Sequence, residues 1–567
     1  MKLDRILPLS ICAAIIISFF FLILKNSVNI PNGDDMYCLL LFTQQFQDAS
    51  GVVERFQLLI QQWVEHRIVF SRLSALASYA LHGGQVNFVT IIFLGNLSLV
   101  GFVLLFRKML LKLGVSMYYL IPVVLTLFSP IMYEGNLWAG ACTVYMPVCL
   151  MGLLTAYLLA HPSRGRFVAA LGVALLATFS FGNGMFAFVA GLFILIFQQQ
   201  YRRAVIWFII MVSGVAFYFH NFFNASATDA FSFSAHFQHP SYLFYNLFSF
   251  LGGILDSTEN SNMPLQPNNI PGVIFGILLT VITLFGVYHF FFGKSARSRN
   301  GKERVPEIAW LGMVAFFALT ALSMAYSRTS GESVNTLSSR YKIYSMIAFI
   351  LVYIWCLMAI RRKTVIGWLF GVFSFSLLAF NYYATYGKLA NFKSVLLAGQ
   401  YNFNKNHQWV IYRHTAYYEG ASRAVCDTIQ SKAKPVFAFA KPFQDLDHEA
   451  LKNGKTLSDI QISESKNCHG FVGNCLVVNS DSYPEMGNFV SGIYLVAYND
   501  KNIFLFPAIP KRNGRVNMLT QRDYFKPGFY VDENFGKSLG VGVEYQLAVF
   551  CPSAKEKIRL IDHKIKG

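Results

Sequence analysis

The feature that most constrains this chain is a series of long apolar segments separated by short basic clusters. The first segment runs from Ile6 to Leu24, and similar segments recur up to Tyr383. Hydrophobic residues make up 54% of the 567 residues and charged residues 13%, which is about half of the usual share of roughly 25%. Because about 20 apolar residues can cross a bilayer as a helix, the pattern predicts a polytopic α-helical membrane protein.

We expect about eleven spans, two of which come from one long apolar stretch. That stretch, Phe167 to Phe197, is interrupted by Ser180-Phe181-Gly182-Asn183-Gly184, whose glycines and asparagine favour a tight hairpin. A shorter run, Tyr242 to Leu255, is predicted to be re-entrant or interfacial. The other predicted spans are Ile6 to Leu24, Phe88 to Phe106, Tyr118 to Met132, Thr143 to Ala160, Ala204 to Phe219, Gly272 to Phe292, Ile308 to Tyr326, Ile343 to Ile360 and Val365 to Tyr383.

Seventeen lysines and arginines lie in six clusters between these segments and set the predicted orientation. Basic residues beside a span stay preferentially in the cytoplasm, which places the N-terminus inside and the C-terminus outside. The formal net charge of +18 therefore indicates topology and contact with anionic lipid rather than nucleic-acid binding. The clusters are Lys2 and Arg5; Arg107, Lys108 and Lys112; Arg164 and Arg166; Arg202 and Arg203; Lys294, Arg297, Arg299, Lys302 and Arg304; and Arg361, Arg362 and Lys363.

A polar loop, residues 26–87, follows the first span, which we interpret as a retained anchor because it shows no clear cleavage site. Met36 to Phe46 and Val52 to Ile60 are too short to span and are predicted to be interfacial helices. The loop opens with Asn32-Gly33-Asp34-Asp35. Two adjacent carboxylates near a membrane need a cation, a proton or a polar partner, so they are candidate catalytic groups. The alternative is a solvated turn, since these residue types favour turns.

The composition changes at about Ala384, where the chain becomes polar with mixed charge. We therefore predict a membrane domain over residues 1–383 and a small extracytoplasmic α+β domain over residues 384–567. Within the second domain, Tyr401 to Ile429 is predicted to be helical. Phe489 to Phe506 and Gly528 to Phe550 alternate as strands do.

Four of the nine cysteines, Cys426, Cys468, Cys475 and Cys551, fall in this exported domain. Exported cysteines favour disulfides. Cys468 and Cys475 enclose a short glycine-containing loop and are the preferred pair. A zinc site is the alternative, although the spacing matches no common set of ligands.

The polar residues of the predicted outer loops form the candidate site, whereas the predicted cytoplasmic loops are short and basic. Carboxylates can deprotonate a hydroxyl or hold a divalent metal, arginines can bind a phosphate, and aromatic rings can stack on a sugar. Each residue also has a simpler explanation, such as snorkelling arginines or an interfacial tryptophan. The candidates are Asp34 and Asp35 as catalytic groups, and Glu65, His66, Arg67, Arg72, Glu134, Asn136, Trp138, Asn183, Arg328, Arg340 and Tyr341 as substrate-binding groups.

The acidic motif just after the first span, together with the topology of the whole chain, resembles the GT-C superfamily of membrane glycosyltransferases. Those enzymes use polyprenyl-phosphate-linked sugars as donors, and many carry a soluble C-terminal domain. The resemblance implies that Asp34 or Asp35 activates the acceptor and that arginines hold the donor phosphate, although this chain has Asp-Asp where Asp-Glu is expected. Supporting runs are Glu65-His66-Arg67 with Ser71-Arg72, Tyr133-Glu134-Gly135-Asn136 with Trp138, and Ser339-Arg340-Tyr341.

The sequence therefore predicts transfer of a sugar from a polyprenyl-phosphate carrier to a surface glycan such as lipopolysaccharide O-antigen, or to a lipid-linked acceptor. The expected location is the outer face of a bacterial inner membrane. A transporter, flippase or polymerase of lipid-linked oligosaccharide is the alternative, but a transporter should show repeat symmetry and polar groups at the midplane of the membrane. We expect no cofactor beyond a possible divalent metal. The chain has no glycine-rich nucleotide-binding loop.

Overall fold

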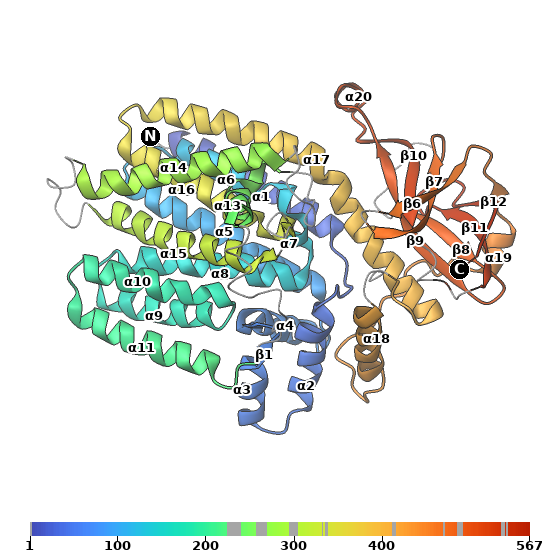
Figure 1. The fold of residues 1–567 in the computed structure, drawn as a ribbon, viewed down its shortest axis with the longest axis horizontal. Coiled ribbons are helices and arrows are strands. Elements are labelled where there is room, and N and C mark those ends of the chain that lie inside the picture. The colour runs from blue at the N-terminus through green and yellow to red at the C-terminus, as the bar shows by residue number, and fades with distance from the viewer. Residues whose placement is uncertain are drawn as a thin grey trace. The chain divides into compact units, whose positions relative to one another are not determined.

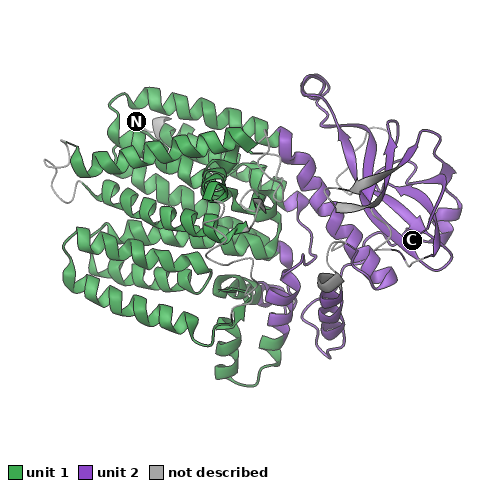
Figure 2. Ribbon diagram, in the orientation of Figure 1, with its two compact units in different colours: residues 1–23, 45–77, 90–382 green, residues 24–44, 78–89, 383–567 purple. Residues whose placement is uncertain are grey.

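The computed structural model describes residues 3–223, 240–256, 269–293, 304–330, 333–334, 338–410, 416–468, 471–484, 492–533, 539 and 542–566. These residues form two compact units (Figure 2). Unit 1 comprises residues 1–23, 45–77 and 90–382, and unit 2 comprises residues 24–44, 78–89 and 383–567. The two units are described separately below.

Unit 1 is a bundle of helices (Figure 1). Among the described residues, nine helical segments are long and apolar enough to cross a membrane, which confirms the prediction of a polytopic helical membrane protein. These segments are α1 (Leu3–Asn26), α5 (Phe88–Lys112), the broken segment Met117–Leu137, α8 (Ala139–Leu159), α11 (Tyr201–Phe219), α14 (Ile270–Phe292), α15 (Val305–Ser327), α16 (Lys342–Ala359) with the preceding turn from Ser339, and α17 (Lys363–Asn406).

The predicted hairpin accounts for the difference between nine and about eleven spans. Its helices α9 (Arg164–Thr178) and α10 (Phe186–Phe197) are joined by a 3-10 turn, Gly182–Met185. They contain 15 and 12 residues, whereas a span needs about 20. Gly184 makes the sharp turn possible, because a Cβ there would lie 1.9 Å from the carbonyl oxygen of Ala177.

The predicted span Tyr118 to Met132 is not one regular helix. A 3-10 turn leads into α6 (Ile121–Leu127), and after a break the chain continues through a second turn into α7 (Tyr133–Leu137). Pro130, which lacks a backbone N–H, follows the break. The Ser129 hydroxyl there accepts a hydrogen bond of 2.9 Å from the Asn381 amide. Residues 133–138, which lie between two of the predicted spans, are mostly in the short helix α7.

The predicted re-entrant run forms α13 (Pro240–Gly252) and a 3-10 turn ending at Leu255, and it packs closely on α14. A Cβ on Gly252 would lie 1.8 Å from the carbonyl oxygen of Gly272, so only glycine allows this approach. With 13 residues, α13 is too short to cross a bilayer.

The loop after the first span contains the two expected short helices. Residues Met36–Leu41 form a π-helical turn that continues into α2 (Phe42–Asp48), and α3 runs from Val52 to Ile60. A two-residue hairpin of β1 (Gln62–Trp63) and β2 (His66–Arg67) leads into α4 (Val69–Leu81). The side chains of Val52, Val53 and Phe56 on α3 are 83%, 71% and 53% exposed, as an interfacial helix requires.

Unit 2 contains an eight-stranded half-barrel sheet (Figure 1). The strand order is β5-β12-β11-β8-β9-β10-β7-β6, and every pair is antiparallel except β12 with β5. The strands are β5 (Lys455–Thr456), β6 (Gln461–Cys468), β7 (Phe471–Ser480), β8 (Ile493–Tyr498), β9 (Ile503–Arg512), β10 (Phe525–Glu533), β11 (Glu544–Phe550) and β12 (Ile558–Lys566).

The central strands are buried on both faces. On β8, Leu495 and Ala497 belong to one core cluster, while Tyr494 and Val496 belong to the other. The second cluster is covered by Tyr401 of α17 and by the short helix α19 (His448–Lys452). The prediction of strands in 489–506 and 528–550 is correct for their described residues, which hold β8 and β11 and parts of β9 and β10.

Other parts of the C-terminal prediction are wrong. The sequence analysis missed β5, β6, β7 and β12. The expected helix Tyr401 to Ile429 is not continuous, because α17 ends at Asn406 and α18 spans Ala416–Gln430. The helix α17 also runs well past the predicted end of its span at Tyr383. Its extension is held on β9 by Asn402, whose amide donates to the Leu505 carbonyl at 2.8 Å and accepts from the Leu505 N–H at 2.7 Å.

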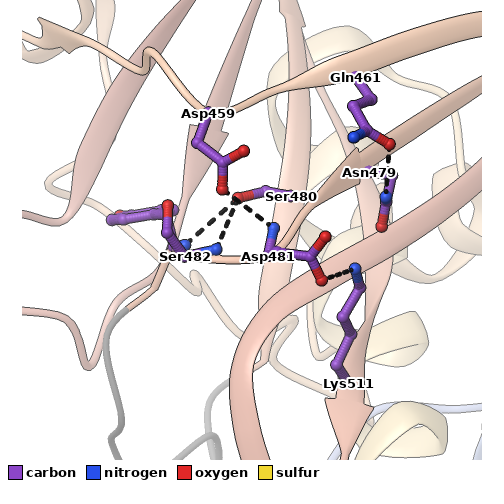
Figure 3. A network of polar contacts seen from close by, with 8 residues as sticks. Asp459, Gln461, Asn479, Ser480, Asp481, Ser482 and Lys511 are labelled. Carbon is purple, nitrogen blue, oxygen red and sulfur yellow. Dashed lines mark hydrogen bonds and ion pairs between the residues drawn. The ribbon is translucent and has the colours of Figure 1, made fainter.

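Polar contacts fix the turn that follows β7 (Figure 3). The Ser480 hydroxyl oxygen accepts from the backbone N–H of Tyr483 at 3.2 Å. The Asp459 carboxylate accepts from the N–H of Asp481, whose own carboxylate pairs with Lys511 at 2.6 Å. The contacts of Asp481 are exposed, so they define the shape of the turn more than they add to the free energy of unfolding, whereas the Ser480–Tyr483 bond is buried.

Of the cysteines in the C-terminal part, Cys475 is disulfide-bonded, while Cys426 and Cys551 are buried free thiols. The side chain of Cys468 lies outside the described residues. Burial raises the pKa of the Cys426 thiol to about 12, so this thiol is unreactive at neutral pH.

Candidate functional site

Polar and aromatic side chains from distant parts of the sequence meet at one end of unit 1. They come from α7, the start of α8, the end of α15, and the 3-10 turn Ser339–Tyr341 that precedes α16. The backbones of α7 and of this turn lie close together, because a Cβ on Gly135 would be 3.4 Å from the Cα of Arg340. We call the set Glu134, Trp138, Tyr145, Arg328, Arg340 and Tyr341 the arginine–tyrosine cluster.

Glu134 is held by residues just before α16. The Ser339 hydroxyl donates to the Glu134 carboxylate at 3.0 Å and accepts from the Glu134 N–H at 3.1 Å. A guanidinium nitrogen of Arg340 lies 4.0 Å from the same carboxylate, and the two side chains are 27% and 25% exposed. Glu134 therefore has a fixed position, and part of its hydrogen-bonding capacity is already used.

Two guanidinium groups flank the ring of Tyr341. The guanidinium carbon of Arg340 is 5.2 Å from the ring centroid, and that of Arg328 is 5.6 Å away. Arg340 also lies 5.5 Å from the ring of Trp138. The ring of Tyr145 meets that of Tyr341 edge to face at 5.1 Å. The Arg340 side chain also hydrogen-bonds that of Tyr341, whereas Arg328 is held by the aromatic face.

The arginine–tyrosine cluster carries more positive than negative charge. It holds two arginines and one carboxylate, and Arg328 has no ion-pair partner among the described residues. Such an arrangement favours an anion, and the planar fork of N–H donors on arginine matches the oxygens of a phosphate.

His66 and Phe181 extend the cluster toward the hairpin of α9 and α10. Their rings are 3.9 Å apart, and Phe181 contacts Tyr145 at 5.3 Å. Burial, and next the positive charge of Arg328, lower the pKa of His66 to about 4. The imidazole is therefore neutral at physiological pH, and its Nδ1 is buried without a hydrogen-bond partner among the described residues.

The basic clusters meet at the other end of the same helices. The guanidinium carbon of Arg203 lies 5.7 Å from the ring of Phe167, and that of Arg304 lies 4.7 Å from Phe290 and 5.9 Å from Phe197. These contacts bring together the starts of α9, α11 and α15 and the ends of α10 and α14. The 23 residues of α15, about 35 Å long, separate this end from the arginine–tyrosine cluster.

Arg67 and Arg72 have a structural role that the sequence analysis missed. The guanidinium of Arg67 donates to the carbonyls of Ile60, Tyr218 at 2.9 Å and His220 at 3.0 Å. Arg72 donates to the carbonyls of Leu59 and Gln61. Both side chains are buried. They satisfy carbonyls at the ends of α3 and α11 that have no partner within their own helix.

The two candidate asparagines are buried rather than presented to solvent. The Asn183 amide donates to the hydroxyl of Tyr344 at 3.1 Å, linking the hairpin to α16. The Asn136 carbonyl accepts from the Asn96 amide at 2.9 Å, which ties α7 to α5. Glu65 is half-buried in the β1–β2 turn. These three residues therefore lie outside the arginine–tyrosine cluster.

The acidic pair belongs to unit 2, although we expected it in the membrane domain. Its segment, residues 24–44, contacts α18, where the Cys426 thiol lies 3.6 Å from the sulfur of Met36. The Gln44 amide oxygen accepts from the Val436 N–H at 3.1 Å, and Val436 in turn accepts from Val86. The predicted outer loop thus supplies part of the unit that contains the half-barrel.

The two carboxylates of the pair lie in different environments. Asp35 is 1% exposed, and its carboxylate accepts from the Asn32 N–H at 3.1 Å, which closes a turn with Gly33 at a φ of +52°. Asp34 is half-buried. The turn interpretation therefore describes Asp35, while Asp34 keeps access to solvent.

Several contributors to the cluster were missed at the sequence level. Tyr145 lies within an apolar span, so composition gave no signal for it, and Ser339 was noted only as part of the run Ser339-Arg340-Tyr341, without a role. Among the described residues, no group of three or more His, Cys, Asp or Glu side chains is arranged to hold a metal ion.

Comparisons with protein-family models, with curated proteins and with solved structures find no match for this chain. The class of protein is therefore defined by its fold and its candidate site alone. The protein is a polytopic membrane protein with a C-terminal half-barrel unit, and an arginine-rich polar cluster lies at one end of its helices.

Proposed function

We propose that this protein is a glycosyltransferase of the outer face of a bacterial inner membrane. It would move a sugar from a polyprenyl-phosphate carrier to a cell-surface glycan or a lipid-linked acceptor. The arginine–tyrosine cluster carries this proposal, because it combines an excess of positive charge with the half-buried ring of Trp138 at a helix end opposite the basic clusters.

The cluster fits the donor of such a reaction. Arg328 would hold the phosphate through charge-assisted hydrogen bonds, with Arg340 adding charge from a site fixed by Glu134. Trp138 is half-buried and has a ring that suits the apolar face of a sugar, while the buried Tyr341 positions the two arginines. As the carbon–oxygen bond to the phosphate breaks, its electron pair goes to polyprenyl phosphate, and a guanidinium stabilises the negative charge that develops there.

We assign Asp34 to the acceptor because its acidic motif resembles that of GT-C glycosyltransferases. The acceptor hydroxyl forms the new bond to the anomeric carbon of the sugar and loses its proton to a carboxylate. Asp35 is 1% exposed, so its carboxylate cannot be reached by an acceptor. Asp34 is the half-buried acid of the motif, so it is the better candidate for the base.

The proposal is tested with purified protein in vesicles that contain a panel of polyprenyl-phosphate sugars and acceptor glycans. The readout is release of polyprenyl phosphate, which every transfer reaction of this class produces. Wild type should release it with one donor, and Asp34→Asn should not. Movement of the intact donor across the vesicle membrane without release of polyprenyl phosphate would replace the transferase with a transporter.

A further inference from the structure

A second site lies at the basic end of unit 1, away from the arginine–tyrosine cluster. A cavity of about 380 Å³ opens there between the end of α14, the start of α15 and the end of α16. This volume is within the range of small-molecule sites, whose lower limit is about 300 Å³. We call it the basic pocket, and its principal lining residues are His289, Glu307, Trp310, Trp355, Arg361 and Lys363.

The charge of the basic pocket is positive. Glu307 is its one acidic lining residue, and Arg304 lies 3.5 Å from that carboxylate. Arg361 and Lys363 also line the pocket, and neither has an ion-pair partner among the described residues. Two cationic side chains are therefore available to a ligand.

The walls of the basic pocket are rigid. Trp310 is buried and donates from its indole to the Leu351 carbonyl at 2.8 Å. Gly286 lies against both tryptophans, where a Cβ would be 2.8 Å from Trp310 and 3.0 Å from the indole nitrogen of Trp355. A larger residue at position 286 would therefore displace one of the rings.

The surface beside the basic pocket is apolar and exposed. On α14, the side chains of Phe285, Tyr288 and Phe292 are 57%, 61% and 73% exposed. Such a face on a span is the surface that acyl chains cover. A cationic pocket next to an apolar surface matches the two parts of an anionic phospholipid.

We propose that the basic pocket binds the phosphate headgroup of an anionic phospholipid from the surrounding leaflet. Arg361 and Lys363 contact the phosphate, the two tryptophans enclose the glycerol region, and the acyl chains lie along α14. Basic pockets between spans on the cytoplasmic side are a known setting for such headgroups. The site is independent of sugar transfer, because it uses none of the residues of the arginine–tyrosine cluster.

Native mass spectrometry of the full chain in mild detergent provides the test. The protein is titrated with phosphatidylglycerol, with phosphatidylcholine of the same acyl chains, and with inorganic phosphate. We expect retention of phosphatidylglycerol over phosphatidylcholine. Arg361→Ala with Lys363→Ala should weaken that binding about 30-fold, since each basic contact contributes roughly five-fold. Arg362→Ala is the matched control, because Arg362 is exposed and does not line the pocket.

A second variant, Gly286→Leu, displaces a tryptophan wall of the pocket without changing its charge and should also reduce retention of phosphatidylglycerol. Unfolding temperatures of all variants in detergent show whether the fold is kept. Equal binding of the two lipids, or equal loss in Arg362→Ala, would overturn the proposal. Retention of inorganic phosphate with no preference between the two lipids would instead identify a soluble anion as the ligand and would also overturn the proposal.

Discussion

The arginines at one end of unit 1 serve two different purposes. In the segment 60–72, Arg67 and Arg72 are buried and direct their N–H groups at backbone carbonyls. In the arginine–tyrosine cluster, Arg328 and Arg340 both flank the ring of Tyr341, and Arg328 has no ion-pair partner among the described residues. The same residue type therefore acts as a structural clamp in one region and as a candidate ligand group in the other, depending on whether its hydrogen bonds are already made.

The two carboxylates of the acidic pair should also differ, one acting in the reaction and the other in stability, and this gives the largest expected effect. Asp34→Asn should lower the rate of sugar transfer by about 10²- to 10⁴-fold, because a general base is removed while shape is kept. Asp35→Asn should mainly lower the unfolding temperature, because its carboxylate closes the turn at Asn32. Release of polyprenyl phosphate per folded molecule measures the first effect. Equal rates for wild type and Asp34→Asn would remove Asp34 from the reaction.

The next effect tests the arginine with available donors. Arg328→Ala should reduce the rate of transfer by about 10- to 150-fold, the loss expected for one or two hydrogen bonds to a charged group. Arg328→Lys should recover part of it, because charge returns without the planar fork. Arg202→Ala, an exposed arginine at the opposite end, is the control and should match wild type. If Arg328→Ala and Arg202→Ala have equal rates, Arg328 does not hold the donor.

Arg67→Ala should instead affect stability. It leaves buried carbonyls at the ends of α3 and α11 without donors, at a cost of about 1–3 kcal/mol for each unsatisfied group. Thermal unfolding in detergent should show a lower midpoint, and transfer per folded molecule should stay near the wild-type rate. A normal midpoint together with a lost transfer rate would make Arg67 a ligand group after all.

The smallest effect concerns pH. The folded-state pKa of His66 is about 4, against about 6.5 in an unfolded chain. Between these values the unfolded state binds the extra proton, so this contribution to stability is complete above pH 6.5 and declines as the pH falls toward 4. His66→Gln should therefore lose less stability than wild type between pH 7 and pH 5 in thermal unfolding. If the unfolding temperatures of wild type and His66→Gln depend on pH in the same way, the pKa of His66 is not lowered by burial.

The sequence predicted the helices well because membrane burial needs long apolar segments, which are visible in composition. It missed the break near Pro130, where a distant asparagine supplies a hydrogen bond at Ser129. It also missed strands such as β6, whose residues are mainly polar. Local pattern cannot show that β6 is completed by its pairing with β7.

The candidate site was predicted in part, for a similar reason. Arg340, Tyr341 and Glu134 were identified from residue type, and the structure brings them together. Residue type could not distinguish Arg328 from Arg67, because that difference depends on whether carbonyls from distant helix ends are close by. The membership of Asp34 in unit 2 likewise depends on contacts with α18, about 390 residues further along the chain.

The most direct test of the phosphate-binding role of the arginine–tyrosine cluster is the binding of polyprenyl phosphate against polyprenol of the same length. It is measured by native mass spectrometry in an Arg361→Ala and Lys363→Ala background, so that the basic pocket does not contribute. We expect the protein to bind polyprenyl phosphate much more strongly than polyprenol. This preference should be retained in Arg202→Ala and lost in Arg328→Ala. Equal binding of phosphate and alcohol, or a preference that survives Arg328→Ala, would contradict it.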